Sequence, residues 1–424
     1  MLQTFKNAWK IPEIRKKILF VLLMILVYRI GCAIPVPFVD ASQIEVGSSS
    51  FFGLFNLLTG GAFEQYAVFA LGITPNINAS IIIQLLTMVI PSLERLSKEG
   101  EEGRQKIAQI TKYVTLGIAL LMAIGFTLGF GNILVNNNFI TYLFVIVTLT
   151  AGSMLLMWIG DLMTEKGIGN GISMLIFISI VARIVPSGRT LINNVSLGMP
   201  WWLIPLIIVG AVLLFAAIVF MDRAERKVSV NYAKKVVGRK MYGGQSTHIP
   251  MKLNPSGVLP VIFAMSITTL PQMIAQWFPS SGFAAFIMNW FSQGAATWYG
   301  KLIYIVVYGA LIVFFAYFYT TMSFNPPEVA KNLKENGGFV LGIRPGKPTS
   351  DYLSRILNRI TLVGSLFLTL VAILPILLGI FSPYLTNMAL GGTSVIILVN
   401  VALETTNQLE SQMLMRHYKG FLKG

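Results

Sequence analysis

Ten long apolar runs dominate this 424-residue chain and constrain its fold more than any other feature. The runs lie at residues 18–38, 68–90, 113–131, 139–160, 172–186, 202–221, 257–277, 302–323, 360–381 and 393–403. Most approach the ~20 residues that a helix needs to cross the hydrocarbon core of a bilayer. Hydrophobic residues make up 55% of the chain, which is far too much for a soluble globule. We therefore predict an all-α polytopic membrane protein with ten transmembrane helices.

Lysine and arginine are distributed very unevenly among the segments that connect these runs. Alternate segments carry 28 of the 32 Lys and Arg residues, namely 1–17, 91–112, 161–171, 222–256, 324–359 and 404–424. The opposite side has only Arg189 and Lys301, and the remaining two, Arg29 and Arg183, fall inside runs. Because cytoplasmic loops retain Lys and Arg during insertion, we predict that both termini and the long basic loops face the cytoplasm.

The first run resembles a permanent anchor more than a cleavable signal. It ends in Pro35-Val36-Pro37, without a small-residue cleavage pattern. The single cysteine, Cys32, cannot form an internal disulfide, and the two histidines, His248 and His417, do not suggest a metal site. We therefore expect no metal and no cofactor.

Acidic residues avoid the apolar runs. All 17 Asp and Glu residues lie in connecting segments or at the ends of runs, with Glu404 nearest to an exception. Transporters that couple to protons or sodium usually place ionisable groups near the bilayer midplane. We expect Arg29 to snorkel to the outer interface, and Arg183 lies close to the end of its run. A pathway lined by apolar and uncharged polar groups suits a varied polymer better than a desolvated ion.

Interruptions in the runs recur at an offset of five runs. The second and seventh runs carry early breakers at 69–76 and 254–260, and the short fifth and tenth runs follow glycine-rich entries at 167–172 and 391–394. Because an odd number of spans inverts the second half, this offset predicts an inverted repeat with a central site at the broken helices. The alternative is the ordinary use of Gly and Pro in membrane helices.

This repeat predicts two five-helix halves. The first half covers 18–186 and the second covers 202–403, joined by an external hinge loop at 187–201. A cytoplasmic arm at 1–17 precedes them, and a cytoplasmic tail at 404–424 follows them.

The outer segment at 39–67 contains no Lys or Arg and is too short to be a domain. Its apolar stretch 51–58 is too short to cross the membrane. Irregular backbone survives at membrane depth only inside protein or beside a wet cavity. We therefore predict a re-entrant helix that dips from outside into a central vestibule, with an interfacial helix lying flat on the outer leaflet as the alternative.

The two long cytoplasmic segments, 222–256 and 324–359, are predicted docking surfaces. Loops of this length are uncommon unless they have a function, and basic loops with aromatics suit phosphate backbones or an acidic protein partner. The alternative is that they serve only topology and anionic lipid. Residues 342–348 do not complete a phosphate-binding loop, because Pro348 follows Lys347 where Ser or Thr is required. Energy for directed transport must therefore come from partners.

Several motifs are long and unusual. They are Gly72–Pro75 running into Ala79–Leu86, Glu165–Ser173, Val230–Lys234, Gln245–His248 and Phe339–Gly346. Together they resemble the SecY/Sec61-alpha family, whose bacterial member is the central subunit of the Sec protein-conducting channel. The resemblance covers essentially the whole chain and keeps the order of the ten runs.

The resemblance implies an hourglass channel, not an enzyme. Such a channel passes unfolded secretory polypeptides across the membrane and releases membrane segments sideways through a lateral gate between the second and seventh spans. The family's pore-ring positions fall on Ile73, Ile77, Ile172, Ile176, Ile262 and Ile397. The implied re-entrant plug, about residues 51–65, includes Phe52, Leu54, Phe55, Leu57 and Leu58. A polar gate cluster falls on Gln84 and Asn170, and cytoplasmic partner docking falls on Arg239, Lys240 and Arg344.

The resemblance also implies partners and a location. The partners are the small membrane subunits SecE and SecG, the motor ATPase SecA, the ribosome and substrate polypeptides that bear signal sequences; the basic loops add anionic lipids. The location is the bacterial inner (plasma) membrane. A secondary transporter would share inverted repeats and broken helices, but the missing midplane carboxylate argues against it. A membrane scaffold or enzyme is the remaining class, and the sequence offers no nucleophile–base pair, metal cluster or nucleotide loop for it.

Overall fold

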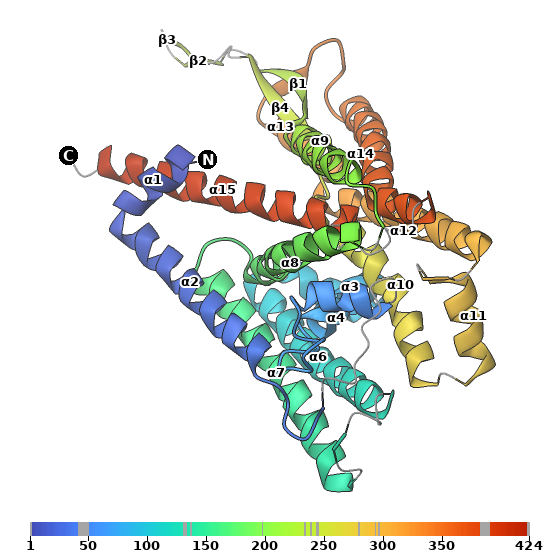
Figure 1. Ribbon diagram of the computed structural model, residues 1–424. Helices are drawn as coiled ribbons and strands as arrows, with labels where there is room; N and C mark the ends of the chain where they lie inside the picture. Colours follow the sequence, from blue (N-terminus) through green and yellow to red (C-terminus); the bar gives the residue numbers. More distant parts are fainter. Residues whose placement is uncertain are drawn as a thin grey trace. The chain divides into compact units, whose positions relative to one another are not determined.

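The computed structural model describes residues 2–421 except 41–50, 130–133, 136–137, 197, 233–234, 238–239, 243–245, 279, 293, 296 and 382–390. Figure 1 shows a mainly helical chain with a few short strands. The helices are α1 (Leu2–Lys10), α2 (Pro12–Ala33), α3 (Phe51–Leu58), α4 (Thr74–Val89), α5 (Pro91–Lys98), α6 (Glu101–Gly129), α7 (Phe139–Lys166), α8 (Gly171–Ser196), α9 (Leu203–Arg223), α10 (Leu259–Trp277), α11 (Gly282–Trp290), α12 (Trp298–Ser323), α13 (Pro326–Glu335), α14 (Lys347–Phe381) and α15 (Gly392–Phe421). The strands are β1 (Glu225–Tyr232), β2 (Lys235–Val237), β3 (Lys240–Tyr242), β4 (Ser246–Lys252) and β5 (Gly338–Val340).

Every apolar run overlaps a helix. In chain order these are α2, α4, α6, α7, α8, α9, α10, α12, α14 and α15. Among the described residues, six helices (α6, α7, α8, α9, α12 and α14) are long and apolar enough to cross a bilayer. The pair α4 and α5 makes a seventh if it counts as one span, although the two helices meet at 101°. The polytopic helical fold is therefore confirmed, while ten as the number of spans stays a prediction.

The predicted interruptions of the second and seventh runs coincide with helix starts. Residues 68–73 form turns, and α4 begins only at Thr74, with Pro75 in its first turn, where a proline costs the helix no hydrogen bond. Gly72 has a φ of +58°, which a side chain with a Cβ rarely adopts. Likewise, α10 begins at Leu259 after a turn in which Gly257 has a φ of +60°.

The helices that contain the fifth and tenth apolar runs extend well beyond the runs themselves. Helix α8 continues to Ser196, so 187–196 of the predicted hinge loop is helical. Helix α15 has 30 residues and extends through most of the predicted cytoplasmic tail. Polar residues such as Gln408 and Glu410 are good helix formers, so α15 continues past the end of its apolar stretch.

The chain divides into two compact units, and the two predicted five-helix halves stay a prediction. The first comprises Met1–Ile204, Met265–Ile305 and Pro375–Gly424, and the second comprises Pro205–Ala264 and Val306–Leu374. The first unit is centred on a buried apolar cluster that joins the segment after α3 to α6 and α7. Much of the sequence assigned to the second half thus belongs to the unit that contains the whole first half.

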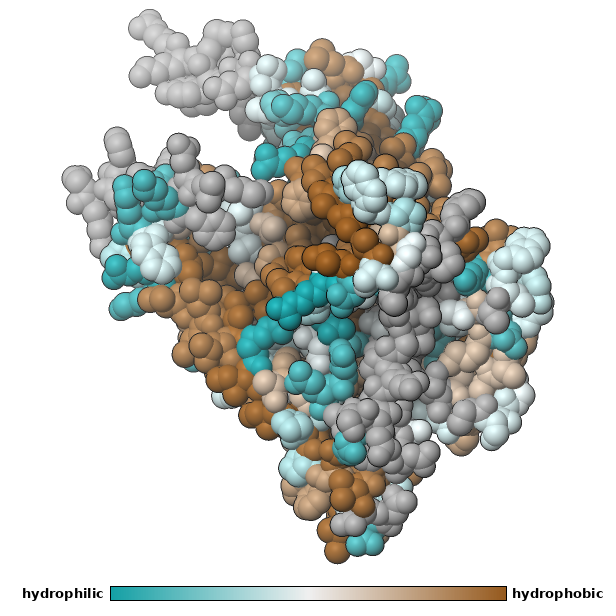
Figure 2. All heavy atoms as spheres, viewed as in Figure 1, coloured by the Kyte–Doolittle hydropathy of each residue, from teal (hydrophilic) through white to brown (hydrophobic). Residues whose placement is uncertain are grey.

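Many large apolar side chains of the first unit are exposed. On α2, Leu19, Leu22, Leu26 and Ile30 recur every three or four residues with Leu23 beside them, and each of the five is about half exposed. Figure 2 shows the corresponding brown surface along this helix. An exposed stripe of this length would be unfavourable in water, and it suits a helix covered by acyl chains.

The second unit contains a small sheet that the sequence indicated only in part. The stretch Val228–Tyr232, with its strand-prone composition, lies in β1. Strand β1 pairs antiparallel with β4, from Glu225 opposite Lys252 to Asn231 opposite Ser246, and also with β5. The strand order is therefore β4-β1-β5, and a separate hairpin joins β2 and β3. Because β5 follows α13, the sheet ties the two long basic segments together.

Candidate functional site

The apolar stretch of the outer segment forms a short helix that is embedded in protein. Helix α3 has eight residues and packs against α8. Phe55, Asn56 and Leu57 are all buried, and Phe55 is only 4% exposed. A helix lying flat on the outer leaflet would expose its apolar face to lipid. The interfacial alternative is therefore wrong, and the predicted re-entrant helix is confirmed.

Three aromatic rings hold the end of α3 against α6. The rings of Phe55, Phe63 and Phe126 lie with their centroids 5.2 to 5.3 Å apart in each pairing, in edge-on or tilted orientations. Such geometry is favoured by the quadrupoles of aromatic rings. Phe63 and Tyr66 are among the most completely buried side chains. The chain that follows α3 is therefore part of the core of its unit.

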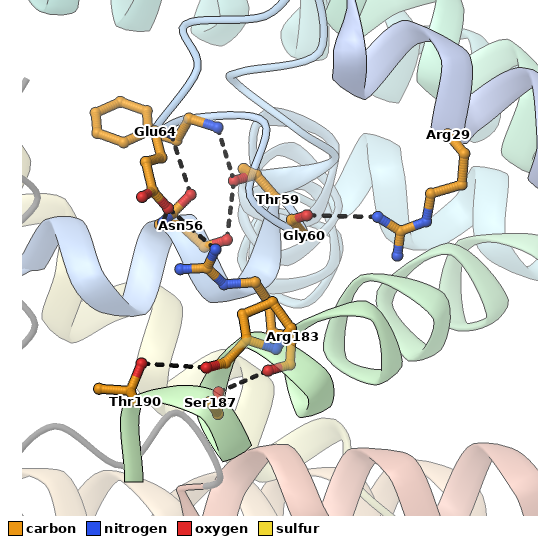
Figure 3. Close-up of polar contacts among 10 residues, drawn as sticks. Arg29, Asn56, Thr59, Gly60, Glu64, Arg183, Ser187 and Thr190 are labelled. Atoms are coloured by element: carbon orange, nitrogen blue, oxygen red, sulfur yellow. Dashed lines mark hydrogen bonds and ion pairs between the residues drawn. The ribbon is translucent and has the colours of Figure 1, made fainter. Parts of the chain in front are cut away.

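Polar contacts link α3 to α8 through Glu64 (Figure 3). Nδ2 of Asn56 donates to Oε2 of Glu64 at 2.9 Å, and the backbone N–H of Glu64 donates to Oδ1 of Asn56 at 3.1 Å. Nη1 of Arg183, from α8, donates to the same Oε2 at 3.0 Å. The side chain of Asn56 is 1% exposed, so these bonds satisfy an amide that would otherwise be buried without partners.

A second arginine holds the turn between α3 and Glu64 from the other side (Figure 3). Arg29, from α2, donates through Nη2 to the carbonyl of Ile178 at 2.6 Å and through Nη1 to that of Gly60 at 3.4 Å. Arg29 is thus held by backbone carbonyls of the protein, and its predicted place at the outer interface stays a prediction. Because backbone carbonyls accept its hydrogen bonds, the guanidinium does not need water as a partner.

The carbonyl of Thr59 in the same turn receives two further donors from α2. The hydroxyl of Tyr28 donates to it at 3.2 Å, and Sγ of Cys32 lies 3.9 Å away as a weak donor. Gly60 has a φ of +66° and passes so close to α8 that an added Cβ would lie 3.1 Å from Cα of Ser179. Residues 59 and 60 are therefore fixed to both α2 and α8.

The six predicted pore-ring isoleucines lie on the expected helices or directly before them. Ile73, Ile77, Ile176 and Ile397 are buried, whereas Ile172 and Ile262 are partly buried. Five belong to the first compact unit, and Ile262, on α10, belongs to the second. Their arrangement as a ring stays a prediction.

The two predicted gate residues have different surroundings. Asn170 is exposed and directly precedes α8, where its Oδ1 accepts the backbone N–H groups of Ile172 at 3.0 Å and Ser173 at 3.3 Å. This is the contact of a helix N-cap. Gln84 is partly buried on α4.

The predicted docking residues lie in the second unit. Arg344 is exposed between β5 and α14, and its carbonyl accepts the hydroxyl of Thr349 at 2.8 Å. Lys240 begins β3, and Arg239 lies outside the described residues. In the plug segment, Leu58 ends α3, and the side chains of Phe52 and Leu54 lie outside the described part.

Sequence reasoning missed the polar contacts that hold the plug segment. The sequence does not mark Asn56 and Glu64 as functional, and it places Arg183 only near the end of its run. A signal was present, because an arginine inside an apolar run requires a partner. The outer segment that supplies Glu64 also contains no Lys or Arg of its own.

Comparison with known proteins agrees with this architecture. A family model described as SecY matches residues 67–406. The protein translocase subunit SecY of Streptomyces scabiei is 44% identical, and that of Halalkalibacterium halodurans is 43% identical, each over the full length of both chains. A solved structure of a protein-conducting channel matches with a TM-score of 0.70 at 19% identity, covering 94% of this chain and 92% of that one. Sec61 from a canine ribosome-channel complex matches with a TM-score of 0.66, also at 19% identity and with the same coverage.

Fold and relatives together define the channel-forming subunit of a protein translocase. Its helices span the membrane many times, and it is a protein-conducting channel. The chain belongs to the SecY family.

Proposed function

We propose that the six isoleucines Ile73, Ile77, Ile172, Ile176, Ile262 and Ile397 form the constriction of this channel. Branched, uncharged side chains around one opening make a dewetting barrier to ions. They bind no passing side chain strongly, so a chain of any sequence can slide past. The β-branched stem of isoleucine restricts χ1 and keeps the aperture defined.

Burial together with position at interrupted helices carries the proposal. Isoleucines such as Ile140 and Ile208 are more than half exposed, as expected for residues that face lipid, while others outside the proposed ring, such as Ile312, are buried as well. Ile73, Ile77, Ile176 and Ile397 lie inside the protein, on helices whose starts carry glycine or proline. Interrupted helices at matching positions of two repeats indicate a central site in transport proteins.

The plug segment and the lateral gate complete the proposed channel. Helix α3, with Phe52, Leu54, Phe55, Leu57 and Leu58, would close the outer side of the constriction. A solved SecY whose plug domain is described as stabilising the closed state matches this chain with a TM-score of 0.67. An apolar signal helix would enter between α4 and α10 near Gln84 and Asn170, and would favour the open state only through its preference for the open gate.

Partners would supply the energy. Relatives of this fold include Sec61 in a ribosome-channel complex and yeast Ssh1 bound to a ribosome, which supports the ribosome as a partner. We propose that Arg239, Lys240 and Arg344 contact the ribosome or SecA, that SecE and SecG complete the complex, and that anionic lipids bind the basic loops. The proposed location is the bacterial inner membrane, with both termini in the cytoplasm.

The constriction is tested by replacing the six isoleucines together with serine. The purified protein, reconstituted in a planar bilayer without a translocating chain, should then conduct ions at rest, because hydroxyls wet the opening. The matched control replaces exposed isoleucines such as Ile140 and Ile208 with serine and should stay closed. An unchanged resting conductance of the six-fold variant would contradict the assignment.

Cross-linking gives an independent readout. A photoreactive residue at position 77 or 262 should capture a stalled secretory chain, whereas one at position 208 should not. Gradient-driven uptake of a small solute by the purified protein would instead support a secondary transporter.

A further inference from the structure

Two sets of polar contacts hold the plug segment, and they differ in exposure. The turn at Thr59 and Gly60 is held by Tyr28, Cys32 and Arg29 from α2, among largely buried groups. The contacts of α3 itself converge on Glu64 (Figure 3), whose side chain is 52% exposed, while that of Arg183 is 25% exposed. Water can replace the second set far more easily than the first.

Glu64 acts as a junction between a buried and an exposed contact. Its Oε2 accepts both Nδ2 of Asn56 at 2.9 Å and Nη1 of Arg183 at 3.0 Å. One carboxylate oxygen therefore connects α3 to α8. Asn56 is held a second time through its Oδ1, which accepts the backbone N–H of Glu64 at 3.1 Å.

The end of α3 can act as a hinge. The carbonyls of Thr59 and Gly60 are held by α2, so the chain from Thr59 onward can stay in place while the backbone bends between Leu58 and Thr59. Phe55 of α3 belongs to the same aromatic cluster as Phe63 and Phe126, so its ring has to leave this cluster when α3 moves.

We propose that Asn56, Glu64 and Arg183 form a polar latch that holds α3 in the closed channel and opens before α3 moves. The step from Leu58 to Thr59 forms the hinge, and the contacts from α2 keep the hinge anchored at Thr59 and Gly60. The three latch residues position the plug and do not contact the substrate. This inference rests on the proposed role of α3 as the plug.

A double-mutant cycle tests the ion pair. Glu64→Gln and Arg183→Gln, each in the full chain reconstituted in planar bilayers, should each raise the open fraction at rest about twofold to fivefold, as expected for a partly exposed pair. The double variant should open no more than either single variant, because each substitution already removes the same contact. Additive effects, or no effect of either single substitution, would overturn the latch.

Asn56→Ala tests the buried half of the latch. Because it removes two hydrogen bonds from a buried site, it should raise the open fraction more than Glu64→Gln does, by about tenfold. The matched control is Arg189→Gln, which removes an exposed arginine from the same helix as Arg183 and should leave the channel closed. An Asn56→Ala channel that stays as closed as the control would contradict the proposal.

The native Cys32 distinguishes hinge motion from unfolding. It is the chain's single cysteine, is 7% exposed and lies beside the anchored turn. In the latch variants, its alkylation by a small maleimide should stay as slow as in the parent protein while the conductance rises. Faster alkylation in step with conductance would mean that the turn itself is released, and the anchored hinge would be wrong.

The serine variant of the six isoleucines serves as the reference in the same bilayers. If it conducts at rest while the latch variants stay closed, the latch is wrong and the channel assignment stands. If neither conducts, both fail.

Discussion

Glycine sets how closely α7 and α8 approach beside the proposed constriction. A Cβ on Gly171 would collide with the carbonyl oxygen of Gly160, and one on Gly160 would lie 3.2 Å from Cγ1 of Ile172. Gly188, further along α8, has open space where its Cβ would be. Gly171 and Gly188 lie on the same helix, but only at Gly171 does the close approach of α7 leave no room for a side chain.

Gly171→Ala should destabilise the protein by roughly 1–3 kcal/mol, because backbone has to shift to admit the methyl group. Gly188→Ala should be neutral or stabilising by up to ~1 kcal/mol, since alanine is the better helix former. Thermal unfolding of both variants in the same detergent measures the difference. Equal melting temperatures would show that the crossing of α7 and α8 tolerates a side chain.

Single residues also show where sequence reasoning stops. The apolar character of the pore-ring positions was evident from the sequence, and so was the break at Gly72 and Pro75. The partner of Arg29 was not, because a carbonyl such as that of Ile178 becomes available only when α2 and α8 pack. Contacts between side chain and backbone across 149 positions leave no local pattern.

Among the elements, β1 connects the two long basic segments. Val230 is fully buried and lies opposite Thr247 of β4 and Val340 of β5. Its neighbour Ser229 points to the exposed face. The docking surfaces proposed for partners therefore share one small sheet and its apolar core, which includes Leu353 and Leu357 of α14.

Val230→Ala should loosen this sheet by about 1–2 kcal/mol, through the loss of buried methyl groups. Trypsin should then cut the segments at 222–256 and 324–359 faster, because they are rich in Lys and Arg. Ser229→Ala, which changes the exposed face, is the matched control and should leave the rate unchanged. Equal cleavage of the two variants would contradict a shared core.

Helix length was the least predictable property of the elements. Apolar content defines where a segment can cross a membrane, and by that criterion the fifth and tenth runs look short. Hydrogen bonding continues a helix through polar residues as well, so α8 and α15 extend into sequence that was assigned to a loop and a tail. The pairing of β1 with β5 could not be predicted from the sequence either, since more than a hundred residues separate the partners.

On the scale of the whole molecule, the two ends of the chain meet within the first unit. Helix α1 packs against α15, and Ala8, Ile14, Ile168 and Leu409 share a small buried cluster. The side chain of Lys17 donates to Gln412 at 3.4 Å. Adjacent ends are consistent with the placement of both termini on one side, as the distribution of Lys and Arg predicts.

Labelling of introduced cysteines tests this orientation. In a Cys32→Ser background, an impermeant maleimide should reach Ser97→Cys and Ser229→Cys only from the cytoplasmic face, and Asn193→Cys only from outside. All three positions are exposed, so access depends on the side of the membrane and not on burial. Labelling of Asn193→Cys from the cytoplasmic face would reverse the predicted topology.

If α3 is the plug, as proposed, the anchored turn that follows it also limits how far the displaced plug can travel. Eight residues of helix measure about 12 Å, so a rod fastened at Gly60 stays within roughly that radius of its attachment. Return of α3 to the constriction is then an intramolecular step whose rate does not depend on protein concentration. Loop motions of this size take nanoseconds to microseconds. A pore closed in this way can regain its ion barrier almost as soon as the last residue of a passing polypeptide has left.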